Sequence, residues 1–585
     1  MTETKEIITD KNDVEVLKLI SMKQRLLEVA ILFGSGIFMT LSLPEVNWSL
    51  TAWVSLAPML IIIRNKSIFA AWRGGFCWSL GWGFTAFYWL REIDPVIPYL
   101  MAPVISLFVA CWAMTVPVIW RFLLLPADVR RGGFVAIRDY DWKRPWREFF
   151  VAIVISALWC IIVEWARSMM LPWNFLGSSQ WRNLPLIQIC EYTGVYGVSF
   201  LIVLFNVTLA MTVLCFQRKA ISFKNPRRAP LLPTLGLIII VILAGYYSTV
   251  ARMRMKIPTR TLRAGLVQGD ISQRRNANFA MAKEALDIYV AMSRQLLVEK
   301  PDVVIWPECA VPVPLRSGGM LGELFRENMA SLIKESNTPF LIGSLDFTDK
   351  PLPETGQHGY LNSALMLVPE KGIVDQFDKI HRVPFGEYVP FRSILPEWIV
   401  KRIDMNRDLT PGTDFSPIEL RPGFRAGISV CFEDVFPYIS RREALLGANM
   451  LLVITNDAWY PTSAEPEQHL ANSVFRAIET RLPFLRCGNN SASCLVSPTG
   501  MITKCLMEKS GPDGGRIPAP ELRGRTHGII EVEVPEKTVA TFYTRYGDVF
   551  ILFCWIIAVA GFVMVAAAWF SDRKSLEDCF ASDKA

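Results

Sequence analysis

The sequence is short of histidine and of closely spaced cysteines. It has only 4 His in 585 residues, and none of its 12 cysteines forms a Cys-x-x-Cys pair. The ligand spacings that hold structural zinc are therefore missing, and we expect neither a metal nor a cofactor. Cys487, Cys494 and Cys505 could include a disulfide if they face an oxidising compartment, but their spacing alone does not establish one.

Charge is also sparse, since charged residues make up 20% of the chain and hydrophobic residues 52%, with 19 Trp. This composition is typical of a membrane protein with a substantial soluble part. The formal net charge is +7, but the basic residues lie between apolar runs, so we do not expect a nucleic-acid partner. Residues 1–25 are polar, too long and too acidic for the start of a signal peptide, and are predicted to be a cytoplasmic tail.

Long apolar runs dominate the first half of the chain. Several reach the roughly 20 residues that cross a bilayer. They cover approximately 26–43, 50–63, 74–90, 98–120, 149–170, 194–216 and 231–250, and a further run covers 549–570. We therefore predict a seven-helix transmembrane domain over 26–250, an eighth transmembrane helix over 547–570, and a cytoplasmic tail over 571–585.

The basic residues of the loops predict the orientation. The loops after the second, fourth and sixth runs hold Arg64, Lys66, Arg73, Arg121, Arg130, Arg131, Arg138, Lys143, Arg144, Arg147, Arg218, Lys219, Lys224, Arg227 and Arg228. Loops rich in Lys and Arg stay on the cytoplasmic side. Both termini are then cytoplasmic, and the chain from residue 251 to the last run lies on the outer side.

From about 260 to 536 the composition becomes that of a soluble domain in which strand-like and helical runs alternate. Strands are expected at 262–268, 303–306, 340–345, 363–368, 425–431 and 448–455, with a strand pair in 485–498. Helices are expected at 280–298, 324–336 and 469–481. This alternation predicts a layered α/β fold.

Three of the predicted strand ends carry reactive side chains. The strand 425–431 ends on Cys431, the strand before Trp306-Pro307 leads to Glu308, and the run 376–379 ends on Lys379. A strand end can hold a thiol at a fixed point above a sheet. A carboxylate base, a cation and a thiol at three such ends favour nucleophilic acyl chemistry.

The sequence around these residues resembles the nitrilase, or carbon–nitrogen hydrolase, superfamily. The matching motifs are Trp306-Pro-Glu308, Lys379-x-x-x-Val-Pro-Phe-Gly-Glu-Tyr388 and Thr455-Asn-Asp-Ala-Trp-Tyr460. The resemblance implies an αββα sandwich in which Glu308 is the general base, Cys431 the nucleophile and Lys379 the oxyanion stabiliser. With its apolar runs, the chain from about 25 to 570 resembles the apolipoprotein N-acyltransferases of the bacterial inner membrane, whose nitrilase domain faces the periplasm.

This resemblance implies a two-step acyl transfer through a thioester on Cys431. The donor would be a phospholipid such as phosphatidylethanolamine, and the acceptor the N-terminal amine of a diacylated apolipoprotein. Two alternatives stay open. One is a membrane-tethered amidase or nitrilase that hydrolyses a small amide, and the other is a non-enzymatic transporter or scaffold with a decayed outer domain.

Other residues are expected to assist the triad. Glu387 is either a loop cap or, as the resemblance implies, the acid that orients Lys379. Glu433 is either a solvated charge or a site residue, and the backbone N–H of Phe432 is expected to bind the oxyanion. Asn456 and Trp459 are expected to line the pocket wall, by packing or by substrate contact.

Some positions differ from the family pattern or have no predicted partner. Phe432 stands where the family usually has Tyr, and Cys309 stands where Thr or Ser is expected. The apolar residues Ile394, Leu395, Trp398 and Ile399 are predicted to contact lipid. No partner is evident for His358, His381 and His469, and none is assigned to catalysis.

Overall fold

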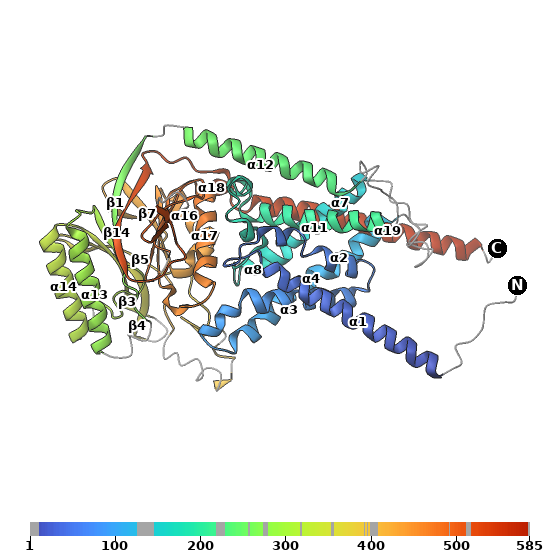
Figure 1. The fold of residues 1–585 in the computed structure, drawn as a ribbon, viewed down its shortest axis with the longest axis horizontal. Helices are drawn as coiled ribbons and strands as arrows, with labels where there is room; N and C mark the ends of the chain where they lie inside the picture. The colour runs from blue at the N-terminus through green and yellow to red at the C-terminus, as the bar shows by residue number, and fades with distance from the viewer. Residues whose placement is uncertain are drawn as a thin grey trace. The chain divides into compact units, whose positions relative to one another are not determined.

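Figure 1 shows the fold of the chain in a computed structural model. It describes residues 11–125, 145–217, 229–254, 258–272, 279–315, 319–352, 356–390, 392–394, 396–397, 408–490, 492–510 and 516–582. The chain divides into two compact units. The first comprises 1–179, 198–240 and 551–585, and the second comprises 180–197 and 241–550.

The first unit is helical. Its helices are α1 (Lys11–Thr40), α2 (Ala57–Ile63), α3 (Ile68–Ala86), α4 (Ile97–Ile119), α7 (Pro145–Trp159) and α8 (Ala166–Ser168), with most of α11 (Val195–Gln217), part of α12 (Leu231–Arg254) and most of α19 (Val549–Ser582). Glycines let two of these helices approach closely. A Cβ on Gly81 of α3 would lie 3.2 Å from the backbone nitrogen of Ile37 in α1, and such contacts are common between membrane helices.

Five helical stretches of the described residues are long and apolar enough to cross a membrane. They cover 97–124, 146–168, 195–217, 231–254 and 549–574. The other three predicted spans fall on α1, on the shorter apolar segment Ser49–Ile63 and on α3, so the number of eight stays a prediction. The orientation stays a prediction too, because most of the basic loop residues lie in 126–144 and 218–228, outside the described residues.

The second unit is built on two six-stranded sheets. The first has the order β14-β1-β2-β3-β4-β5 and the second the order β11-β10-β9-β8-β7-β6. The strands are β1 (Thr259–Gln268), β2 (Val303–Ile305), β3 (Phe340–Pro351), β4 (His358–Val368), β5 (Gly372–Asp378), β6 (Ile418–Arg421), β7 (Phe424–Val430), β8 (Met450–Thr455), β9 (Phe484–Gly488), β10 (Cys494–Val496), β11 (Ile502–Cys505) and β14 (Thr526–Pro535). A separate hairpin joins β12 (Glu508–Ser510) to β13 (Arg516–Pro518).

The two sheets pack face to face, with helices on both outer sides. One apolar core combines Leu266 and Ile305 of the first sheet with Ile428 and Leu452 of the second. Helices α13 (Phe279–Leu297) and α14 (Met320–Ser336) cover the first sheet, and α16 (Pro437–Leu445) and α17 (Glu465–Thr480) cover the second (Figure 1). Central strands such as β8 are buried on both faces, which explains their unbroken apolar sequence. The predicted αββα sandwich is confirmed.

The second unit also contains a segment from between two predicted membrane spans. Residues 180–197 form the short helices α9 (Leu184–Ile187) and α10 (Cys190–Thr193). The Glu191 carboxylate lies 2.8 Å from Nη2 of Arg481, after α17, and 2.6 Å from Nη2 of Arg252, in α12. Gln188 accepts a hydrogen bond of 2.7 Å from Arg481. The compact unit is therefore larger than the range 260–536 that composition indicates.

Candidate active site

The three predicted strand ends meet in the second unit. Glu308 follows β2, Lys379 directly follows β5, and Cys431 directly follows β7. The Nζ of Lys379 lies 3.4 Å from Oε1 of Glu308, and the side chains are only 2% and 7% exposed. Both interact electrostatically with the Cys431 thiol. The fold thus brings a carboxylate, an ammonium and a thiol together from strands of both sheets.

The backbone at the thiol is strained. Cys431 has a φ of +57°, in the left-handed region, where it joins β7 to the 3₁₀ turn Cys431–Val435. Residues other than glycine seldom adopt this conformation, and it persists only where the surroundings impose it. Cys309, directly after Glu308, has a φ of +49°. Sharp backbone turns therefore present two of the three reactive groups.

Glu433 holds the turn after Cys431 in place. Its Oε1 accepts hydrogen bonds from the backbone N–H groups of Ile380 (2.6 Å) and His381 (2.8 Å), and its Oε2 accepts one from Val430 (2.8 Å). The side chain is fully buried, so the interpretation as a solvated charge is wrong. Burial raises the pKa of the Glu433 carboxyl to about 7, although the three donors favour the anion. Glu433 thereby joins β7, which ends just before Cys431, to the segment after Lys379.

Glu387 and Asn362 surround the ammonium. Oε1 of Glu387 lies 2.7 Å from Nζ of Lys379, and its Oε2 accepts a bond of 2.8 Å from the N–H of Val383. Asn362, on β4, donates to Glu308 at 2.8 Å and to Glu387 at 3.4 Å. Asn362 was missed at the sequence level, and its only signal is a polar residue within a buried strand. Together these contacts fix both carboxylates around Lys379.

The charges of the site follow from burial and from this pairing. Burial opposes the charged form of Lys379, but Glu387 and Glu308 hold its pKa well above the usual value. Burial and the neighbouring Glu308 raise the pKa of the Cys431 thiol, while Lys379 lowers it. The resulting pKa is well above the usual value of a thiol. Cys431 therefore keeps its proton at neutral pH until a base removes it.

The remaining predicted residues have different surroundings. The Lys379 ammonium lies 5.4 Å from the ring centroid of Phe432, a cation–π distance. Asn456 is buried, donates to the carbonyl of Glu308 at 3.5 Å and accepts from Asn489 at 2.8 Å. Trp459 is 53% exposed. Ile394 is exposed, whereas Leu395, Trp398 and Ile399 lie outside the described residues. The roles of these residues stay predictions.

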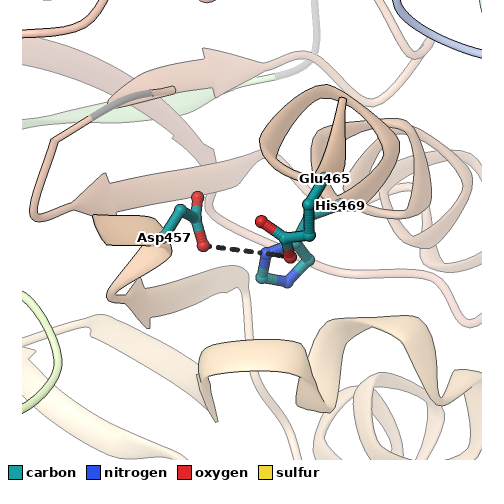
Figure 2. A group of neighbouring side chains, drawn as sticks. All are labelled: Asp457, Glu465 and His469. Atoms are coloured by element: carbon teal, nitrogen blue, oxygen red, sulfur yellow. Dashed lines mark hydrogen bonds and ion pairs between the residues drawn. The ribbon is translucent and has the colours of Figure 1, made fainter. Parts of the chain in front are cut away.

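A buried charged cluster includes Asp434 of the turn Cys431–Val435, and Figure 2 shows three of its members, Asp457, Glu465 and His469. The imidazole Nε2 of His469 lies 2.7 Å from Oδ1 of Asp434. Its Nδ1 lies 3.2 Å from Oδ1 of Asp457 and 3.8 Å from Oε1 of Glu465. Arg486 lies 2.6 Å from the other oxygen of Asp434. Glu465 and His469 are four residues apart on α17, whereas Asp434 and Asp457 lie in turns after β7 and β8, so the sequence alone did not predict the contacts with the two aspartates.

Asp457, Glu465 and His469 are close enough to suggest a metal site. Burial opposes protonation of His469, but Asp434 outweighs it and raises the pKa of the imidazole to about 10. An imidazolium has no free lone pair for a metal, because both ring nitrogens carry protons. The residues therefore fit a buried ion-pair cluster and do not fit a metal centre.

Comparisons with known proteins assign both parts of the chain to families. A family model described as carbon–nitrogen hydrolase matches residues 263–510, and the model of the apolipoprotein N-acyltransferase N-terminal domain matches residues 35–208. A Helicobacter pylori carbon–nitrogen hydrolase structure is similar at 17% identity, covering 51% of this chain and 94% of that one, with a TM-score of 0.31. The family match shows that the second unit contains a carbon–nitrogen hydrolase domain.

Relatives that match most of the length of this chain define its protein family more closely. An apolipoprotein N-acyltransferase of Geobacter metallireducens is 32% identical and covers 93% of this chain and 95% of its own length. One from Brucella suis is 26% identical, covering 85% of this chain and 92% of its own length. The chain belongs to the apolipoprotein N-acyltransferase family. It is thus an acyltransferase and, with its apolar helices, a membrane protein.

Proposed function

We propose that this protein transfers an acyl chain from a phospholipid to the N-terminal amine of a diacylglyceryl-cysteine lipoprotein. The names of its relatives support the reaction class and the lipoprotein acceptor. The observation that carries the proposal is the buried Glu308–Lys379 pair, which interacts with the thiol of Cys431. Phosphatidylethanolamine is the proposed donor.

In the first step the Cys431 sulfur attacks the ester carbonyl while Glu308 accepts the thiol proton. The Lys379 ammonium and the backbone N–H of Phe432 stabilise the oxyanion, and one such donor contributes about 3–4 kcal/mol. Lys379 already carries its charge, because Glu387 and Glu308 favour the ammonium. The ester bond breaks, the lysophospholipid leaves with the proton from Glu308, and a thioester stays on Cys431.

In the second step the acceptor amine attacks the thioester carbonyl. Glu308 accepts the amine proton, and the same two donors stabilise the second oxyanion. The carbon–sulfur bond breaks as the amide forms, and the proton on Glu308 returns to the Cys431 sulfur. Each substrate is thus handled in turn at one thiol, which is a ping-pong reaction.

The proposed location is the bacterial inner membrane, with the second unit facing the periplasm and both termini in the cytoplasm. Both substrates carry acyl chains, and moving those chains into water costs about 0.8 kcal/mol per CH₂. A membrane-anchored enzyme avoids that cost. The exposed side chains of Trp459 and Ile394 are proposed to contact lipid or acyl chains.

The test is a transfer assay with the purified full-length chain in detergent. The protein is mixed with phosphatidylethanolamine and a synthetic diacylated lipopeptide, and the mass of the lipopeptide is measured by mass spectrometry. We expect the mass of one acyl chain to be added, and none to be added when the peptide's amine is acetylated beforehand. Free fatty acid as the sole product would favour the hydrolase alternative, and no turnover of either kind would favour the scaffold.

A further inference from the structure

Two cysteines face each other across the edge of the second sheet. Strands β10 and β11 are antiparallel, and Cys494 of β10 pairs in register with Cys505 of β11. β11 is the edge strand of this sheet. The next pair in register is Leu495 with Lys504, followed by a bulge. The two thiols are thus placed opposite each other by the strand register, although ten residues separate them in the chain.

The hydrogen-bond pattern shows which kind of pair this is. The backbone N–H of Leu506 donates to the carbonyl of Ser493 at 2.9 Å, one residue beyond the cysteines on each strand. Cys494 and Cys505 therefore occupy a non-hydrogen-bonded position, where the Cα atoms of opposite residues are about 4.5 Å apart. Disulfides need Cα separations of about 4.4–6.8 Å, so this position is within reach of a disulfide without movement of the strands.

Both side chains are also buried. Cys494 is 0% exposed and Cys505 is 8% exposed. The neighbouring Cys494 thiol, together with burial, raises the pKa of the Cys505 thiol well above its usual value. The third cysteine of this region is placed differently, because Sγ of Cys487 on β9 lies 3.5 Å from the carbonyl of Ile305 in the other sheet. Cys487 is therefore a natural control.

We propose that Cys494 and Cys505 form a disulfide in the native protein that joins the edge strand β11 to β10. The bond would form by thiol–disulfide exchange with a disulfide-bearing oxidant of the outer compartment. One thiolate attacks the oxidant's disulfide, the second thiolate attacks the mixed disulfide, and the oxidant leaves as a dithiol, having gained both electrons and both protons. This inference rests on the proposed outward orientation of the second unit.

The pairing of the edge strand β11 with β10 is short and irregular, so a covalent link would stabilise it. β10 has three residues and β11 has four, and a bulge interrupts their pairing. The chain then continues into the β12–β13 hairpin, and the N–H of Ala519 donates to the carbonyl of Met507 at 3.0 Å. Short strands at a sheet edge open easily. A disulfide between Cys494 and Cys505 would hold the start of this hairpin against the sheet.

The test traps thiols in bacterial cells that express the full-length chain. Cells are quenched with acid, free thiols are alkylated with N-ethylmaleimide under denaturing conditions, and the purified protein is cut with trypsin without reduction. Cleavage after Arg486, Lys504 and Lys509 separates 487–504 from 505–509. We expect these peptides to be recovered as one disulfide-linked species, which persists in Cys487→Ala and disappears in Cys494→Ala. Full alkylation of Cys494 and Cys505 in the wild type would overturn the proposal.

A stability measurement on the same proteins gives an independent result. Dithiothreitol is expected to lower the Tm of the wild type and of Cys487→Ala by at least about 3 °C, and to leave the Tm of Cys505→Ala unchanged. An equal shift in all three proteins would contradict the proposal. The transfer assay, run on each sample, separates the disulfide proposal from the proposed function. If Cys494 and Cys505 are reduced in active protein, only the disulfide proposal is overturned. If they are linked in inactive protein, only the proposed function is overturned.

Discussion

Lys379 and Glu387 form a largely buried ion pair, with Nζ of the lysine 2.7 Å from Oε1 of the glutamate. The other oxygen of Glu387 is fixed by the N–H of Val383, four residues earlier. The glutamate therefore joins the ammonium to the backbone at Val383. The pair sets both the charge and the position of the proposed oxyanion stabiliser, and the function of Lys379 should depend on it.

Glu387→Gln should slow acyl transfer without preventing folding. The amide keeps the shape of the side chain but removes the charge that favours the ammonium. Loss of one hydrogen bond between charged groups costs about 1.5–3 kcal/mol, which corresponds to a roughly 10–150-fold fall in kcat/KM. The measurement is steady-state transfer to the lipopeptide. Glu284→Gln, on an exposed position of α13, is the matched control, and equal rates for the two variants would refute this role for Glu387.

Gly343 on β3 is expected to tolerate no side chain, because it lies against the backbone of Glu308. A Cβ at this position would be 2.6 Å from Cα of Glu308. Gly343→Ala should destabilise the second unit by about 1–3 kcal/mol and displace the carboxylate, lowering transfer roughly 10–100-fold. Gly319→Ala is the control, since a Cβ there meets no atom within 4 Å. Unchanged activity in Gly343→Ala would show that Glu308 does not depend on this contact.

The buried imidazolium predicts a dependence of stability on pH. The pKa of His469 is about 10 in the folded protein, against an ordinary value of 6.5. A group whose pKa is raised by folding stabilises the fold fully below its unfolded pKa, and this contribution is lost as pH rises from about 6.5 to 10. The wild type should therefore lose stability over this range.

Thermal unfolding at several pH values tests this dependence. His469→Gln should be less stable than the wild type near neutral pH and should show a flatter slope between pH 6.5 and 10. His358→Gln, at an exposed position, should follow the wild-type slope. Parallel slopes for His469→Gln and the wild type would contradict a protonated His469.

The cluster of Asp457, Glu465 and His469 should not require a metal. Prolonged treatment with EDTA is expected to leave both the rate of acyl transfer and the Tm unchanged, and elemental analysis of the purified protein should find no stoichiometric metal. The physical reason is that both ring nitrogens of His469 are directed at carboxylates. Metal at one equivalent, lost in His469→Gln, would contradict the ion-pair interpretation.

The sequence predicted the framework of this molecule well, because the framework depends on local patterns. Buried strands such as β7 and β8 are unbroken apolar runs, and α13 and α17 have helical periodicity, so their residues could be placed within a few positions. The candidate site residues Glu308, Lys379 and Cys431 could be proposed as well, because each follows a recognisable strand, and their roles stay predictions.

What could not be predicted depends on contacts between distant segments. Asn362 reaches Glu308, after β2, and Glu387, in the loop after β5, because β4 lies between β2 and β5 in the sheet. His469 meets Asp434 across 35 residues of chain. The pairing of Cys494 with Cys505 follows from a strand register that is offset by a bulge. Charge and spacing along the chain carry no information about such pairs.

The measurement that tests the account most directly is capture of the acyl-enzyme. Purified protein is incubated with phosphatidylethanolamine labelled in its acyl chain, without acceptor, and the peptide that contains Cys431 is examined for label. We predict label that hydroxylamine removes, that a diacylated lipopeptide discharges as an amide, and that is missing from Cys431→Ala. Folded wild-type protein that transfers acyl chains to the lipopeptide yet never carries label on Cys431 would contradict the thioester mechanism.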